Sequence, residues 1–163
     1  MPDEESKKSG IKVMLKEDIR WSRCDIKSIA LLANTMSFDE AYVKGLKECI
    51  FIRNDIFTEG SHSNVFFVIG DILYTHPESN YILSGITRRN VLRIAHKEGI
   101  TVREEPVHEK SLQFINEAFI TNTSSEVTPV IDLGGYLPGG GIPGPITLRL
   151  QEKFNAGIKA LRG

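Results

Sequence analysis

Closely spaced strand-like runs constrain the fold of this chain more than any other feature of its sequence. Residues 49–52, 65–69 and 72–75 are rich in β-branched and aromatic residues, and turn-forming Asn54-Asp55 and Gly70-Asp71 separate them. Strands that follow one another this closely favour a meander of neighbouring strands. A fold built from regularly alternating strands and helices is therefore not expected.

The rest of the chain intersperses helices among further strands. A regular alternation of strand and helix is missing, as is any repeat of 20–50 residues, so solenoids and propellers are excluded. The pattern favours an α+β fold, built on either a mixed sheet or a pseudo-barrel. The other expected elements are strands at 11–15, 100–107, 118–121 and 127–133, one broken or two short helices within 28–47, and helices at 86–97, 111–116 and 145–161.

Composition narrows the class of protein. The 163 residues, 40% of them hydrophobic, are enough for one domain with a buried core. Lys and Arg number 20 against 21 Asp and Glu, which argues against a nucleic-acid partner. The two cysteines and four histidines lack the spacing of a metal site, and no apolar run is long enough for a membrane span. We therefore expect a cytoplasmic protein without a metal.

Lys27 is the first candidate for chemistry. A lysine at such a position is usually a solvated surface residue. Here, however, Arg20 and Arg23 crowd the same stretch, and the apolar residues Ile29 and Leu31 predict that the position lies beside the core. Burial and nearby cations both lower the pKa of a lysine, as required of an amine that attacks a carbonyl.

Three polar segments complete the set of candidates. Glu59 lies within residues 58–64, which are either a solvated loop or a strand-edge site where a carboxylate faces a ligand. Gly85 precedes a helix that begins at Ile86 and Thr87, where backbone N–H groups could bind phosphate, although any helix can begin this way. The hydroxyl-rich segment 121–126 could donate to the same phosphate or be a solvated turn. By contrast, the glycine-rich segment 139–145 lacks the ending of a P-loop and is interpreted as a turn.

In their order and spacing, these segments resemble the D-amino-acid aminotransferases among the fold-type IV pyridoxal-phosphate enzymes. The resemblance runs from about residue 11 to the last helix, and it is most specific in residues 20–28, 58–66, 72–77, 85–88 and 123–130. It implies a Schiff base between Lys27 and pyridoxal phosphate, with Glu59 against the pyridine nitrogen. The further implied cofactor contacts are Leu83 on the ring, Gly85, Ile86, Thr87 and Thr123 at the phosphate, and Arg20 behind the site. Asn122 stands where the family commonly has serine.

The resemblance also implies a fold, a reaction and an assembly. The implied fold is α+β, with a mixed, largely antiparallel pseudo-barrel sheet and peripheral helices. The expected activity is transamination between D-amino acids and 2-oxo acids, in a homodimer. Residues 1–10 are expected to be a flexible lead-in that remains from an interdomain connection, and 11–163 the large cofactor-binding domain, with the family's N-terminal small domain absent and turnover weak. The alternatives are a branched-chain aminotransferase, an aminodeoxychorismate lyase, or a non-catalytic module that binds the cofactor or dimerises.

Overall fold

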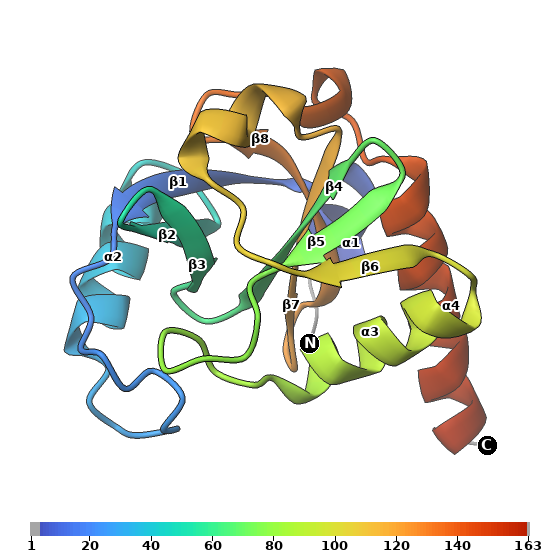
Figure 1. Ribbon diagram of the computed structural model, residues 1–163, viewed down its shortest axis with the longest axis horizontal. Coiled ribbons are helices and arrows are strands. Elements are labelled where there is room, and N and C mark those ends of the chain that lie inside the picture. Colours follow the sequence, from blue (N-terminus) through green and yellow to red (C-terminus); the bar gives the residue numbers. More distant parts are fainter. Residues whose placement is uncertain (1–3, 163) are drawn as a thin grey trace.

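The computed structural model describes residues 4–162, and one mixed sheet organises them (Figure 1). Its strand order is β3-β2-β1-β8-β7-β4-β5-β6. Strand β1 runs parallel to β2 and β8, and β5 parallel to β6, while the other four pairs are antiparallel. The strands are β1 (Ile11–Glu17), β2 (Glu48–Arg53), β3 (Ile56–Gly60), β4 (Asn64–Ile69), β5 (Ile72–Thr75), β6 (Thr101–Glu104), β7 (Glu117–Asn122) and β8 (Glu126–Leu133).

The sheet curls so strongly that β3, at one edge, bonds to the segment that follows β6, at the opposite edge. Phe57 N, on β3, donates to Val107 O at 3.0 Å, and Glu109 N donates to Asp55 O at 2.8 Å. Val107 and Glu109 both belong to the segment that follows β6, the strand at the opposite edge of the sheet. These bonds close the seam of a half-barrel, which confirms the predicted α+β pseudo-barrel.

Side chains that alternate along the strands build hydrophobic clusters on both faces of the sheet. On β4, Val65 and Phe67 point into the cluster inside the curl, while Phe66 and Val68 pack under the helices on the outer face. The helices are α1 (Glu4–Ser9), α2 (Leu32–Val43), α3 (Ile86–Lys97) and α4 (Pro145–Arg162), with the 3-10 turns η1 (Glu109–Phe114) and η2 (Pro138–Gly140). Helices α3 and α4 cover the outer core, and α2 packs beside β1 and β2. Among the helices described, none combines the length and apolar character needed to cross a membrane.

Several elements differ from their sequence-based prediction. The helix expected within 28–47 is continuous and begins only at Leu32. Strand β6 ends at Glu104, ahead of Pro106, which cannot donate to a strand ladder. The short helix is a 3-10 turn at Glu109–Phe114 rather than a helix over 111–116. Strand β3 was not predicted, because three of its five residues are Thr, Glu and Gly. Helix α3 has the predicted bounds.

The described part of the expected lead-in is helical and packs on the sheet. Helix α1 buries the side chain of Lys7, whose Nζ donates to the carboxylate of Glu126 at the start of β8. Gln151 Nε2, on α4, donates to the backbone carbonyl of Lys7 at 3.0 Å. The segment immediately before β1 is therefore anchored to β8 and α4.

Candidate functional site

A buried network of charges lies where β1 ends. The guanidinium of Arg20 donates through Nη1 to Glu59 Oε1 at 2.6 Å, and through Nε and Nη2 to the two oxygens of Asp18 at 2.9 Å each. Arg53 also contacts Asp18, from Nη2 to Oδ1 at 3.1 Å. Arg20 and Glu59 are only 8% and 5% exposed. The sequence places Glu59 on β3 and Arg20 just after β1, and the curled sheet brings them together.

The pKa values of Asp18 and Glu59 are shifted in opposite directions, because burial and the arginines contribute differently to each. Burial raises the pKa of Glu59 to about 7, although Arg20 and the backbone N–H of Leu83 oppose the rise. Burial would also raise the pKa of Asp18, but hydrogen bonds from Arg20 and Arg53 outweigh it and hold that pKa below its ordinary value. Asp18 is thus ionised at neutral pH. The ionisation of Glu59, by contrast, changes when another charge comes close to it.

The second oxygen of Glu59 faces the segment that leads into α3. Leu83 N donates to Glu59 Oε2 at 3.0 Å, and so does Asn64 Nδ2, also at 3.0 Å. Gly85 is the N-cap of α3 and is followed by Ile86 and Thr87. The first N–H groups of a helix have no acceptor within the helix, so they are available to an anion. A carboxylate and a helix N-terminus therefore flank the short segment Leu83–Gly85.

The turn between β7 and β8 reaches the same edge of the sheet. Thr121 pairs with Asn64 in the β4–β7 register, and Asn122 and Thr123 follow directly. Asn122 Oδ1 accepts a hydrogen bond from Ser125 N, which leaves its NH2 as the end that can donate outward. Thr123 is exposed. The structure therefore places the predicted phosphate contacts on the side of the sheet where α3 begins.

Lys27 lies on the loop of residues 18–31, at the lower left of Figure 1. The prediction that it lies beside the core was wrong for the described chain. Lys27 is exposed, and Ile29 is fully exposed, because no other part of the described chain covers the second half of this loop. Arg20 and Cys24, in its first half, are buried. The loop is nevertheless tied to the segment before Leu83: Cys24 N donates to Asn80 O at 2.8 Å, and Asn80 Nδ2 donates to Ser22 O at 2.7 Å.

Sequence reasoning missed several groups that support the site. It assigned no role to Asp18 or Asn64, although Asp18 lies close to the segment 20–28 and Asn64 within the segment 58–66 that it singled out. It also missed Glu48, which is 2% exposed and accepts hydrogen bonds from Cys49 N and Ser61 N at 2.8 and 3.1 Å. Ser63 Oγ donates to the same carboxylate at 2.8 Å. Glu48 thus fixes the turn that joins β3 to β4.

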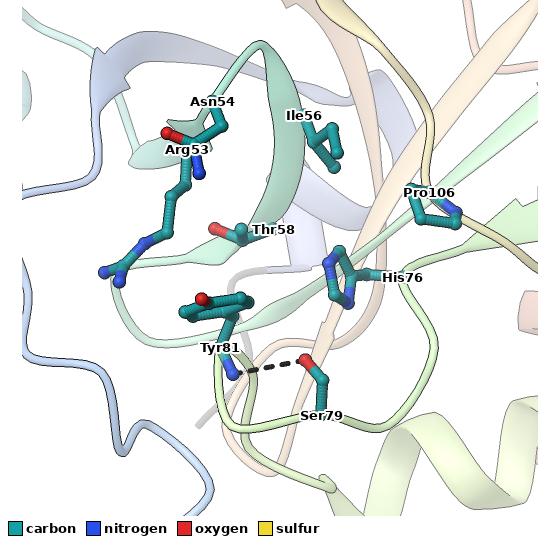
Figure 2. Close-up of a pocket in the computed structure, with 8 residues that line it drawn as sticks. All are labelled: Arg53, Asn54, Ile56, Thr58, His76, Ser79, Tyr81 and Pro106. Atoms are coloured by element: carbon teal, nitrogen blue, oxygen red, sulfur yellow. Dashed lines mark hydrogen bonds between the residues drawn. The ribbon is translucent and has the colours of Figure 1, made fainter.

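An open hollow lies next to the charge network around Arg20, and Figure 2 shows the residues that line it. It has a volume of about 250 Å³ and is lined by Arg53, Asn54, Ile56, Thr58, His76, Ser79, Tyr81 and Pro106. Arg20 Nη2 contacts Thr58 Oγ1 at 3.4 Å and Tyr81 O at 3.2 Å, both in residues of this lining. The guanidinium therefore separates the hollow from Glu59, and the predicted site residues do not line it.

Comparisons with known proteins agree with this geometry. The family described as amino-transferase class IV matches residues 1–133. The D-alanine aminotransferase of Staphylococcus haemolyticus is 42% identical over 152 residues, 93% of this chain and 54% of that protein. The D-alanine aminotransferase of Bacillus licheniformis is 40% identical over 155 residues, 95% of this chain and 55% of that protein. The chain thus spans about half the length of the curated relatives it matches.

Solved structures share the fold. The branched-chain amino acid aminotransferase of Escherichia coli superposes with a TM-score of 0.82 at 32% identity, covering 93% of this chain and 52% of that chain. The branched-chain amino acid aminotransferase of Thermobaculum terrenum, solved in its PLP form, gives 0.80 at 28% identity, covering 89% of this chain and 50% of that chain. The family match extends over most of the sequence, and the fold agrees with it. The chain belongs to the class IV aminotransferase family.

Proposed function

We propose that this chain is the cofactor-binding part of a pyridoxal-phosphate-dependent aminotransferase. The observation that carries the proposal is the buried Glu59 carboxylate, which Arg20 holds from one side and the Leu83 backbone N–H from the other. A buried acid with a pKa near 7 is stabilised as an anion when a protonated nitrogen approaches it. Glu59 is therefore suited to the pyridine nitrogen of the cofactor.

The remaining residues fit the other parts of the same cofactor. Ile86 and Thr87 offer backbone N–H groups to the phosphate at the start of α3, and Thr123 and the amide of Asn122 would add side-chain donors. Leu83 lies between the two ends and would contact the ring. Lys27, on the loop tied to Asn80, would supply the amine. These residues would provide an anion for the ring-nitrogen end of the cofactor and hydrogen-bond donors for its phosphate end.

Each residue would have a separate task in the reaction. When bound, pyridoxal phosphate supplies an aldehyde for amines and a ring that accepts electron density from the substrate. Glu59 would keep the ring nitrogen protonated, which would increase that capacity, and Arg20 would keep Glu59 in place. Lys27 would be the base that accepts the substrate's α-proton at Nζ. Its exposure leaves room for a substrate beside it.

We propose D-amino acids and 2-oxo acids as the substrates. The support is the 40–42% identity to D-alanine aminotransferases, against 28–32% to the branched-chain enzymes of known structure. The alternative is a branched-chain aminotransferase. An amino-donor panel separates them: with the N-terminal domain of a relative supplied, D-alanine should convert the bound cofactor to its amine form faster than L-leucine does. Conversion by L-leucine alone would favour the alternative, and conversion that survives Lys27→Ala would contradict the proposed role of Lys27.

We further propose that the protein assembles as a homodimer through an exposed apolar surface. This surface comprises Ile19, Trp21, Ile26, Ile29, Leu31, Leu32, Met36, Tyr42 and Val43, with Leu32 and Val43 being 74% and 85% exposed. A soluble protein rarely leaves so many apolar side chains of one segment uncovered. Two free cysteines, Cys24 and Cys49, are consistent with a cytoplasmic location, which we also propose.

The assembly can be tested by sedimentation equilibrium. The 163-residue chain should self-associate, and Leu32→Glu with Val43→Glu should lower its average mass toward that of one chain. The matched control is Leu148→Glu with Ile142→Glu, which places the same two charges at residues that are 42% and 68% exposed, on α4 and just before it. An unmodified chain that sediments as a monomer, or equal effects of the two changes, would contradict this interface.

A further inference from the structure

Asn64 links Glu59 to the backbone of the segment before α3. Its side-chain amide donates to Glu59 Oε2 at 3.0 Å and to Leu83 O at 2.8 Å. An amide NH2 carries two hydrogens, and both are used by these two acceptors. Asn64 is only 5% exposed, so water does not compete freely for either bond. The orientation of the amide is therefore fixed by a carboxylate on one side and a carbonyl on the other.

This orientation turns the amide oxygen toward Gly85. A Cβ at position 85 would lie 2.2 Å from Asn64 Oδ1, which is closer than nonbonded carbon and oxygen can approach. The backbone of Gly85 has φ −67° and ψ 140°, an extended conformation that any residue adopts. Glycine is therefore needed here to make room for the Asn64 amide rather than to provide an unusual backbone angle.

We propose that Asn64 is a positioning residue that couples the two ends of the cofactor site. It holds the Glu59 carboxylate against the Leu83–Gly85 segment, so that a displacement at the start of α3 moves the carboxylate at the ring-nitrogen end. If a side chain were added at position 85, the Asn64 amide would have to move, and this would weaken its hydrogen bonds to Glu59 and Leu83. The proposal rests on the proposed function, because it assigns these two ends to the ring nitrogen and the phosphate.

The test is a cycle of the variants Gly85→Ala, Asn64→Ala and the double variant. The dissociation constants of pyridoxal phosphate and of pyridoxal, which lacks the phosphate, are measured by equilibrium titration of the 163-residue chain. Each single change should weaken binding of both compounds by roughly tenfold, because each displaces Glu59. In the Asn64→Ala background, Gly85→Ala should cause a clearly smaller loss, since the added Cβ no longer meets the amide.

A matched control separates positioning from a general loss of stability. Asn34 is a second buried asparagine, and its Nδ2 donates to a backbone carbonyl, Ser61 O, at 2.8 Å. Asn34→Ala should lower the unfolding midpoint without the same loss of affinity for pyridoxal. If Asn64→Ala does not fold, Asn64→Ser provides a milder change, whose hydroxyl cannot donate to both acceptors.

Two negative results are distinguishable. Additive effects in the cycle, or a Gly85→Ala change that weakens pyridoxal phosphate but leaves pyridoxal binding unchanged, would overturn the coupling and leave the proposed function intact. An unmodified chain that binds neither compound in a Lys27-dependent manner would overturn the proposed function, and the coupling with it.

Discussion

Replacing Arg20 by methionine should destabilise the chain in a pH-dependent way. Methionine fills similar space but removes the charge that Glu59 and Asp18 share. Breaking a buried ion pair by removing one partner costs about 3–5 kcal/mol, because a charge is left buried without a partner. For a chain of this size each kcal/mol lowers the melting temperature by about 2–4 °C, so the expected loss is about 6–20 °C near neutral pH.

The pH dependence follows from Glu59. Its pKa is about 7 in the folded chain against an ordinary value of 4.5, so the folded state binds more protons and loses stability as pH rises through this window. Without Arg20 the anion has no counter-charge, so the pKa of Glu59 rises further and the loss of stability continues to higher pH and becomes larger. Asp18 keeps its hydrogen bond from Arg53, which continues to favour the Asp18 anion. Urea unfolding should therefore show a larger cost of Arg20→Met at about pH 8 than at about pH 5.

Two further variants make this prediction refutable. Arg20→Met combined with Glu59→Gln should recover much of the cost at about pH 8, because the unpaired anion is gone. Arg23→Met removes an arginine whose pair with Asp25 is exposed, and it should leave the stability unchanged at both pH values. An equal cost of Arg20→Met at both pH values, or a double variant that simply adds the two losses, would show that Glu59 and Arg20 are not coupled as described.

Three other substitutions test whether buried hydrogen bonds and ion pairs stabilise the fold. Glu48→Gln should cost about 1–3 kcal/mol in urea unfolding, because buried donors lose their anionic acceptor; an unchanged midpoint would contradict this. Glu117 accepts from the first N–H groups of α4, so Glu117→Ala should cost about 1–2 kcal/mol and speed amide exchange in the first turn of α4 but not of α3. Lys7→Met should speed amide exchange in α1, whereas Lys8→Met, at an exposed position, should not; equal effects would refute the anchoring of α1.

The elements that could be predicted are those whose local pattern agrees with their burial. Helix α3 has the predicted bounds because its apolar residues recur at helical spacing and Gly99 follows it. Strand β3 was missed because Thr58, Glu59 and Gly60 interrupt the apolar pattern, yet the structure buries all three. A strand that carries polar site residues lacks the regular alternation of apolar and polar residues by which strands are recognised in a sequence.

The site was predictable only as separate segments. Motif and resemblance identified Glu59, Gly85 and Lys27, but the contacts among the segments depend on the curl of the sheet. Asn64 could not be assigned because its two acceptors lie 5 and 19 residues away in the sequence. The supposed burial of Lys27 failed for a related reason: apolar neighbours indicate burial only when another part of the protein covers them.

The covalent position of the cofactor is the central claim, and borohydride trapping tests it most directly. Pyridoxal phosphate is added to the 163-residue chain, borohydride adds hydride to any carbon–nitrogen double bond formed with a lysine, and peptide mapping locates the stable product. We predict one labelled peptide, the one that contains Lys27, and no labelling of it in Lys27→Ala. A label on another lysine, or an unlabelled chain under conditions where the fold is intact, would contradict the assignment.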